Sequence, residues 1–113
     1  MINADAIFIG ANAVDYSGYP DCRLDYISAF EKMANLATKA ALEGKKIHIE
    51  TPLMHLSKSD IITLGKKLGV DYSMTVSSYR ATYDGLACGR CDSCTFRKKG
   101  FLEARVVDNT KYI

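Results

Sequence analysis

Three cysteines lie within one stretch of seven residues, as Cys88, Cys91 and Cys94 in the string Cys-Gly-Arg-Cys-Asp-Ser-Cys. Gaps of two residues let consecutive thiolates turn onto one ion, and Gly89 relieves the tight backbone after the first cysteine. Thiolates are soft ligands that suit zinc, and a structural zinc ion takes four ligands. The spacing therefore predicts a zinc site. An iron–sulfur cluster, or three thiols without a metal, is the weaker interpretation.

The fourth ligand of such a site is not evident from the residues alone. Cys22 is remote in the chain, and the sequence does not place it in space. His48 stands in an alternating pattern, so a packed or exposed strand residue is the simpler interpretation. His55 follows Pro-Leu-Met in a loop and is the more open candidate of the two histidines.

A loop rich in polar and aromatic residues follows the first apolar run of the chain. It spans residues 10–23 and contains acids, tyrosines, an arginine and Cys22, for which we derive no role. In open α/β sheets, ligands bind beyond the carboxyl ends of the strands. One wall of a pocket is therefore expected here, and a turn-rich connector with solvated acids is the alternative. The candidate binding residues are Asp15, Tyr19, Asp21 and Arg23.

One lysine and one short run of basic residues are candidates for contacts with anions. Lys58 lies in the first turn of a predicted helix, where the lysine and free backbone N–H groups would both favour a phosphate. An exposed lysine without a ligand is the alternative. Arg97, Lys98 and Lys99 form a short basic run after the cysteines, typical of a solvated face and otherwise of an anion or partner contact.

The elements that must position these residues alternate between strand and helix. An apolar run at residues 6–10 is typical of a strand covered on both faces, and residues 47–49 predict a second strand. Apolar residues at spacings of three and four predict a helix over residues 24–43 and another over 57–68, which has a capping-box-like start. This order is typical of a parallel α/β sheet.

A parallel sheet of two strands is not stable alone, because its faces and edges need partners. The sequence therefore predicts part of a larger α/β domain. We expect a single partial domain over residues 1–113, with residues 1–70 as the α/β portion and residues 71–113 as the metal-binding portion.

Composition excludes several classes of protein. The chain has 113 residues, of which 48% are hydrophobic and 25% charged, as in one ordinary globular domain and unlike a disordered chain. No apolar run approaches the ~18–20 residues of a membrane helix. The net charge of +2 is too small to predict binding to nucleic acid or to a membrane. Clustered cysteines without a secretory signal favour the reducing cytoplasm.

Four strings carry a family resemblance: Ile-Phe-Ile-Gly, Asn-Ala-Val-Asp-Tyr-Ser-Gly-Tyr-Pro-Asp-Cys-Arg, Thr-Pro-Leu-Met-His-Leu-Ser-Lys-Ser-Asp-Ile-Ile, and the cysteine string followed by Arg-Lys-Lys-Gly-Phe. Together they resemble the 7-cyano-7-deazaguanine synthase family of queuosine biosynthesis. The resemblance covers nearly the whole chain, and the Asp-Tyr-Ser-Gly-Tyr-Pro-Asp-Cys-Arg string is its most specific part.

The resemblance implies an α/β fold of the adenine-nucleotide alpha-hydrolase-like type (HUP or PP-loop), with a C-terminal zinc knuckle. It also implies a ligase that uses ATP to convert 7-carboxy-7-deazaguanine and ammonia to the nitrile preQ0. In such an enzyme Lys58 would contact the phosphates of ATP, and the wall facing the substrate would contain Asp15, Tyr19, Asp21 and Arg23.

The chain departs from the family pattern in two places. The family's phosphate loop, Ser-Gly-Gly-x-Asp-Ser, has no counterpart here. We therefore expect the C-terminal half of the enzyme, inactive alone and completed by the missing N-terminal half or by a homo-oligomer partner. The family's first zinc ligand is the cysteine of a Ser-Cys-Tyr string, which reads Ser77-Ser78-Tyr79 here. The ligand set is then three thiolates with Ser78, water or a recruited histidine.

A function of another class is a small zinc-stabilised module that binds RNA or protein through its basic residues. The small net charge and the lack of aromatic residues among these basic residues weigh against RNA. The basic residues concerned are Arg90, Arg97, Lys98 and Lys99.

Overall fold

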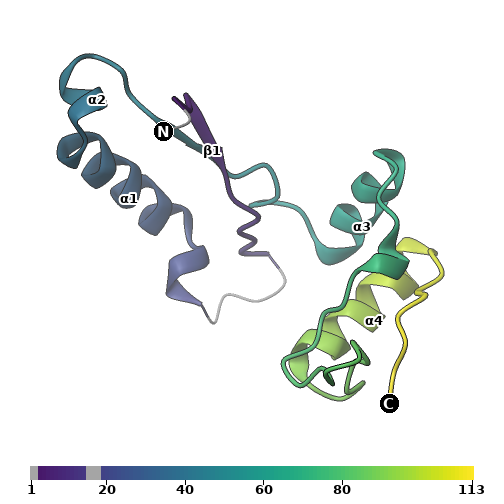
Figure 1. Cartoon of the computed structure of the whole chain (residues 1–113). Coiled ribbons are helices and arrows are strands. Elements are labelled where there is room, and N and C mark those ends of the chain that lie inside the picture. The colour runs from purple at the N-terminus through teal and green to yellow at the C-terminus, as the bar shows by residue number, and fades with distance from the viewer. Residues whose placement is uncertain (1–2, 15–18) are drawn as a thin grey trace. The chain divides into compact units, whose positions relative to one another are not determined.

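Two short strands about forty residues apart in the sequence pair in parallel (Figure 1). The computed structural model describes residues 3–14 and 19–113. Strand β1 (Ala6–Phe8) lies beside β2 (His48–Glu50), with Ile7 opposite Ile49. The pairing confirms the parallel arrangement that the alternation of strands and helices predicts.

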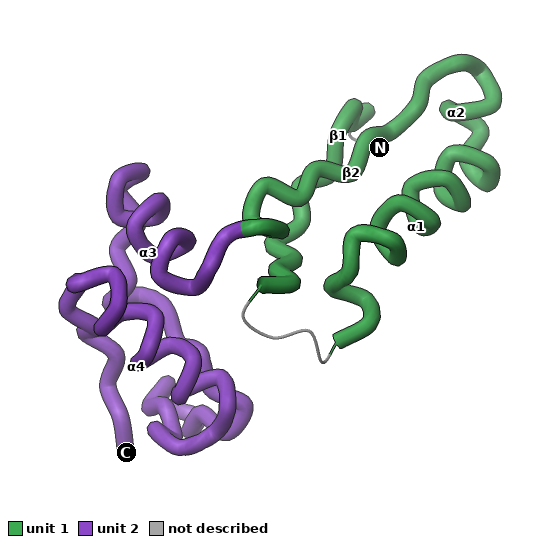
Figure 2. Tube along the Cα trace, turned by 180° about the vertical axis from the view of Figure 1, so that it is seen from behind, with its two compact units in different colours: residues 1–55 green, residues 56–113 purple. Residues whose placement is uncertain are grey.

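The chain divides after residue 55 into two units, Met1–His55 and Leu56–Ile113, which Figure 2 colours separately. Unit 1 contains the sheet, and unit 2 contains the three clustered cysteines. The first helix of unit 2 packs against the helix that contains Cys94 and directly follows Cys91. The expectation of a single domain with portions 1–70 and 71–113 stays a prediction.

Two polar side chains hold helix α1 (Leu24–Ala37) against β2. The amide of Asn35 bonds both backbone groups of Ile47 at 2.9 Å, and Glu31 accepts a bond of 2.7 Å from the backbone N–H of Ile49. The sequence predicts an apolar face on this helix. Ile27 is indeed buried, but Phe30 is 41% exposed, so the polar bonds do much of the positioning.

The prediction of one continuous helix over residues 24–43 is wrong, because the helix is interrupted at one residue. Thr38 is extended, with φ −101° and ψ 139°, and separates α1 from a short helix α2 (Lys39–Leu42). A β-branched residue loses rotamer freedom in a helix, which makes threonine a suitable place for the interruption. Gly44 follows α2 with φ +89°, a left-handed conformation that ends the helix as predicted.

The expected covering of β1 on both faces is not found among the described residues. Phe8 is 72% exposed, and Ile7 and Ile9 are each more than 40% exposed. A pair of strands with one helix on β2 supplies too little surface to cover them. The described core of unit 1 lies beyond the strands, at Ala11, Ile27 and Met54.

Unit 2 begins with helix α3 (Lys58–Lys67), which has the predicted capping box. The Ser57 hydroxyl accepts a bond from the backbone N–H of Asp60, and the Asp60 carboxylate accepts one from the backbone N–H of Ser57. These bonds satisfy N–H groups that have no partner inside the helix. A short 3-10 helix, η2 (Tyr72–Met74), follows α3.

Helix α4 (Asp92–Ala104) was not predicted from the sequence. Its buried positions are Cys94, Arg97, Gly100 and Phe101, which follow a helical period but include only one large apolar residue. Gly100 allows α3 to approach closely, because a Cβ there would overlap the side chains of Lys58 and Ile62. A search for apolar periodicity misses a helix of this kind.

The C-terminal residues close over the cysteine segment. Ala87 donates to the carbonyl of Lys111 at 2.9 Å and accepts from the backbone N–H of Ile113 at 3.0 Å. The residue before Cys88 is thereby fixed by the tail of the chain. Among the described residues, every helix is too short or too polar to cross a bilayer.

Candidate metal centre

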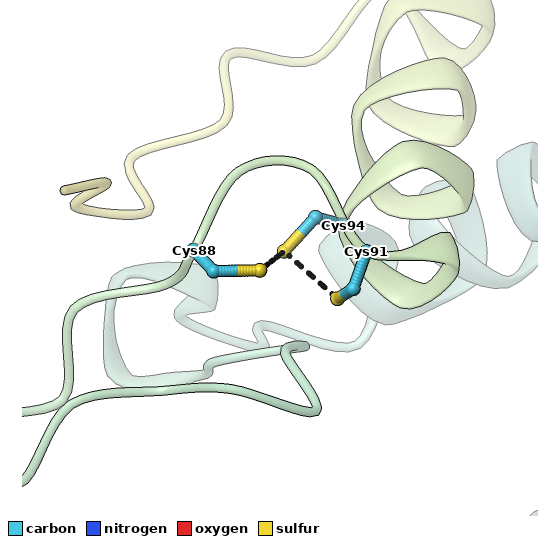
Figure 3. A group of neighbouring side chains, drawn as sticks. All are labelled: Cys88, Cys91 and Cys94. Carbon is cyan, nitrogen blue, oxygen red and sulfur yellow. Dashed lines mark hydrogen bonds between the residues drawn. The ribbon is translucent and has the colours of Figure 1, made fainter.

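The three clustered cysteines turn their sulfur atoms toward one another (Figure 3). The Sγ atoms of Cys91 and Cys94 are 3.5 Å apart, and those of Cys88 and Cys94 are 3.9 Å apart. A tetrahedral zinc ion with Zn–S bonds of ~2.3 Å holds its sulfur ligands about 3.8 Å apart. The donor set and its spacing therefore fit one zinc ion.

Two different local structures position the cysteines. Cys91 precedes the first residue of α4 and Cys94 lies in its first turn, so the helix brings these two thiols to one side. Cys88 reaches them across a turn at Gly89, whose φ of +73° is left-handed. This confirms that glycine relieves the backbone after the first cysteine.

Ser78 lies beside the cluster. Its hydroxyl oxygen accepts hydrogen bonds of 3.2 Å from the backbone N–H groups of Cys88 and Arg80. The same oxygen is 3.9 Å from the Sγ of Cys91. The structure thus places the predicted fourth position next to the three sulfurs, and coordination of a metal by Ser78 stays a prediction.

The surroundings of the cluster favour thiolates. The hydrogen bond from the Ser78 hydroxyl, followed by those from the backbone N–H groups of Arg90 and Cys91, lowers the pKa of Cys88 to about 6. Backbone N–H groups of Cys94 and Tyr79 lower the pKa of Cys91. Because zinc binds the thiolate form, these bonds prepare the site for a metal near neutral pH.

Arg97 is buried, so its assignment to a solvated basic face is wrong. The residue is 4% exposed, and its guanidinium forms an ion pair of 3.0 Å with Asp108. It also donates to Thr75, Ser77 and the carbonyl of Tyr72. A buried charge needs such partners.

The bonds of Arg97 fix the segment that leads to Ser78. Ser77, the residue before Ser78, accepts a hydrogen bond of 3.3 Å at its carbonyl oxygen from the Sγ of Cys94. Sequence reasoning missed this support, although Arg97 lies one helical turn after Cys94 and one before Phe101. The spacing of Cys94, Arg97 and Phe101 becomes a signal of burial only once this segment is known to be a helix.

The other two basic residues of the run lie on the surface. The amine of Lys98 donates to the carbonyl of Gly89 at 2.8 Å and lies over the ring of Tyr112. Lys99 forms an exposed pair with Glu103, 3.8 Å apart. With Arg97 buried, the basic patch expected for an RNA-binding module is reduced.

A hollow of about 420 Å³ adjoins the metal centre. Both Cys88 and Cys91 reach its surface, so solvent has access to this side of the cluster. Two arginines give the hollow a positive character that Asp92 partly offsets. The complete lining is Tyr79, Arg80, Cys88, Arg90, Cys91 and Asp92.

Three of the four predicted substrate residues gather at one short turn in unit 1. Tyr19 precedes the 3-10 helix η1 (Pro20–Cys22), which contains Asp21, and Arg23 follows it. Tyr19 is 47% exposed, and Arg23 forms an exposed ion pair of 3.8 Å with Asp25. Asp15 lies outside the described residues. Their contact with a substrate stays a prediction.

Lys58 is the first residue of α3 and belongs to unit 2. Its aliphatic stem packs over Gly100 of α4, and it lines a small cavity of about 170 Å³ together with Thr75, Ser77 and Arg97. The residue is therefore not a freely exposed lysine, and it helps to join the two helices. Its role as a phosphate contact stays a prediction.

Comparisons with known proteins agree over residues 1–105 of the chain. The family model described as Queuosine biosynthesis protein QueC matches residues 1–105. The 7-cyano-7-deazaguanine synthase of Coxiella burnetii (strain RSA 493 / Nine Mile phase I) is 64% identical over 113 residues, which are 100% of this chain and 50% of that protein. The synthase of Hydrogenovibrio crunogenus is 65% identical over 112 residues, 99% of this chain and 48% of its own length.

The chain spans about half the length of the curated relatives that it matches. The match covers the loop of residues 10–23, the start of α3 and the three cysteines. These are the segments on which the resemblance was based, and it is confirmed. The chain belongs to the family of Queuosine biosynthesis protein QueC.

Proposed function

We propose that this chain provides the C-terminal, metal-binding part of a 7-cyano-7-deazaguanine synthase. The observation that carries the proposal is the 64% identity over the full 113 residues with a relative of that name. The reaction would be the ATP-dependent conversion of 7-carboxy-7-deazaguanine and ammonia to the nitrile preQ0. The three-cysteine cluster, with sulfurs 3.5–3.9 Å apart, supports the metal-binding part of the assignment.

The chemistry explains why such a ligase needs ATP. The oxygen of a carboxylate or an amide is a poor leaving group, so each must be activated before it is displaced. In the proposed sequence ATP activates the carboxylate, ammonia attacks to form the amide, and a second activation allows dehydration to the nitrile. The residues that we propose for the substrate wall are Asp15, Tyr19, Asp21 and Arg23, with Lys58 for the phosphates of ATP.

Zinc would have a structural role in this enzyme. Bound by Cys88, Cys91 and Cys94, it would cross-link the start of α4 to the turn before it. Metal binding of this kind contributes directly to folding. The thiolate site also favours a reducing compartment, so we place the enzyme in the cytoplasm.

The nucleotide site needs residues that these 113 do not provide. The string Ser-Gly-Gly-x-Asp-Ser does not occur in the sequence. A loop of backbone N–H groups is what usually cradles phosphates. We propose that the N-terminal half of the synthase, or a second polypeptide, supplies this loop to the complete enzyme.

A chimeric enzyme tests the proposal. The N-terminal half of the Coxiella burnetii synthase is fused to this chain at the start of their match, and preQ0 and consumed ATP are measured by mass spectrometry. We expect preQ0 from the chimera and none from this chain alone. A Lys99→Ala chimera, altered at an exposed residue, is the matched control and should remain active.

Two results would contradict the proposal. One is a folded chimera that binds ATP and both other substrates but forms no nitrile. The other is preQ0 formation by this chain alone, which would mean that the nucleotide site lies within these 113 residues.

A further inference from the structure

Unit 2 supplies only three strong ligands to its own metal centre. Residues 56–113 contain no histidine, and their cysteines are Cys88, Cys91 and Cys94. Asp92 lines the adjoining hollow, but its carboxylate does not join the ligand atoms that lie within 4.8 Å of one another in the described residues. Within this unit, Ser78 is thus the remaining protein candidate for the fourth position.

The hydrogen bonds of Ser78 argue against coordination by its oxygen. A hydroxyl has two acceptor lone pairs and one proton to donate. Both lone pairs of Ser78 are engaged, because the backbone N–H groups of Cys88 and Arg80 donate to the oxygen at 3.2 Å. The one proton is left for the neighbouring thiolates of Cys88 and Cys91, and Cys91 Sγ lies 3.9 Å from the hydroxyl oxygen. Coordination would break one of these bonds and place a hard, weak donor on a soft metal site.

The hollow beside the cluster gives an outside ligand a way in. Its volume of about 420 Å³ is many times that of a water molecule. Cys88 and Cys91 form part of its wall, so a donor in the hollow lies on the same side as two of the three sulfurs. Arg80 and Arg90 are exposed and also line the hollow, so that their two positive charges against the one carboxylate of Asp92 favour an anion.

We propose that the metal ion of this centre keeps an exchangeable fourth coordination position, which opens into the hollow and takes a small anion from solution. Ser78 then supports the thiolates by donating its proton and does not bind the metal. Closed zinc sites have four protein ligands, whereas three protein ligands leave one position for a ligand from solution. The three thiolates would still cross-link the turn to α4, as the proposed structural role requires. The inference rests on the metal-binding part of the proposed function and is independent of the ligase activity.

Cobalt spectroscopy on the full chain tests the open position. Co²⁺ replaces zinc, and its visible absorption is followed while azide is added. We expect one Co²⁺ per chain and a saturable change of the ligand-field bands with azide in the unaltered protein. Ser78→Ala should keep this response, and Ser78→Cys should abolish it while adding about one third to the sulfur charge-transfer absorption.

Variants of the arginines and of other possible ligands complete the test. Arg80→Gln with Arg90→Gln should weaken azide binding about 3- to 10-fold without changing the cobalt spectrum in the absence of azide. Ser73→Cys, which adds a thiol at an exposed serine bonded to Asp71, should behave as the unaltered chain. Cys22→Ser, His55→Ala and Asp92→Asn should each leave the azide response intact.

Several outcomes would overturn the inference. An azide response that is missing from the unaltered chain but present in Ser78→Ala would make Ser78 the fourth ligand. A response that arises only in Cys22→Ser, His55→Ala or Asp92→Asn would assign the position to that residue. A chain that binds no Co²⁺ and no Zn²⁺ would remove the metal centre itself, whereas a closed metal site would leave the proposed function untouched.

Discussion

Replacing Ser78 by cysteine would put a fourth sulfur beside the three that are already 3.5–3.9 Å apart. Loss of a partner outside the ligand set weakens metal sites ~10–100-fold, so gaining a thiolate ligand should strengthen zinc binding by at least as much. This is about 1.4–2.7 kcal/mol, a modest part of the ~10–16 kcal/mol apparent for zinc-finger peptides. Competition with a zinc chelator at fixed pH measures the difference. Equal affinities would mean that His55 or Cys22 already occupies the fourth position.

The pH at which Cys88 becomes reactive is a second test at the residue scale. Only the thiolate is alkylated by iodoacetamide, and the pKa of Cys88 is lowered to about 6 with the Ser78 hydrogen bond as the first cause. In metal-free protein, alkylation of Cys88 should therefore rise with pH through a midpoint near this value. Ser78→Ala should move the midpoint upward. Peptide mass spectrometry measures the labelling.

Ser77→Ala is the matched control for this experiment. Its hydroxyl accepts a bond from Arg97 at 3.2 Å and not from a cysteine, so its loss should leave the midpoint of Cys88 in place. A midpoint that is the same in the unaltered chain and in Ser78→Ala would show that the serine does not stabilise the thiolate.

The cysteines of the metal centre could be predicted from the sequence, whereas the buried residues that position them could not. Cysteine spacing identifies a metal cluster because short gaps restrict the geometry locally. Arg97 looked like one of three surface cations, since no local pattern reveals that Asp108 returns to pair with it. The pairing depends on the chain turning back after α4, and the tail is then held by its bridge to Ala87, which no local pattern predicts.

At the scale of the element, the packing of α3 on α4 depends on a missing side chain. A Cβ at Gly100 would overlap the Lys58 side chain close to its backbone and crowd Ile62. Overpacking costs ~1–3 kcal/mol, and the better helix propensity of alanine returns about 1. We expect Gly100→Ala to lower the free energy of unfolding of zinc-loaded protein by up to about 2 kcal/mol in urea titrations.

Lys99→Ala is the control for Gly100, because it changes the adjacent residue of the same helix at an exposed position. Its ion pair with Glu103 is 3.8 Å long and exposed, so the loss should stay below ~0.5 kcal/mol. Equal losses from the two variants would mean that the close approach of α3 to α4 is not what Gly100 provides.

The ion pair between α4 and the tail makes stability depend on acid. Burial would raise the pKa of Asp108, but hydrogen bonds from Arg97, Thr110 and Tyr112 outweigh it and hold the pKa below its ordinary value of 3.8. A lowered pKa contributes stability above the unfolded value, and this contribution is lost as pH falls through the folded value. The free energy of unfolding that Asp108 contributes should therefore be lost only at pH values below about 4.

Asp108→Asn should remove this contribution at neutral pH. It leaves the buried Arg97 without its counter-charge, and breaking such a pair costs ~3–5 kcal/mol. The difference in unfolding free energy between Asp108→Asn and the unaltered chain should then shrink as pH falls below about 4. Asp84→Asn, at an exposed carboxylate that forms no ion pair in the part of the chain that the structure describes, is the control. A difference that stays constant with pH would contradict the assignment.

The elements themselves were predictable where their signals are local. Both strands, the capping box at Ser57 and the stop at Gly44 follow from neighbouring residues. Helix α4 was missed because its buried side presents a cysteine, an arginine and a glycine in place of an apolar stripe. The break at Thr38 was missed because helix propensity alone does not place an interruption.

At the scale of the whole molecule, the two units differ in what they need for stability. Unit 1 has a sheet of two strands, and its Phe8 is 72% exposed, so apolar surface remains to be covered. Unit 2 contains the three clustered cysteines, and the ion pair between Arg97 and Asp108 joins its C-terminal tail to α4. The sequence predicts the first of these features, because two strands are too few for a parallel sheet.

Removing the metal should therefore affect the two units unequally. The hydrogen bonds described for the three clustered cysteines come from residues of unit 2, and a bound ion would tie the turn at Gly89 to α4. Chelation should raise amide hydrogen exchange over residues 77–95 and in the tail that bonds Ala87, since metal binding is coupled to folding. Exchange in α1 should change little, because Glu31 and Asn35 hold that helix on β2 without the metal. Mass spectrometry of zinc-loaded and chelated protein measures both regions at once, and Cys88→Ser should reproduce the chelated pattern without chelator. An equal rise of exchange in α1 and in α4 would mean that the metal stabilises the whole chain as one cooperative body.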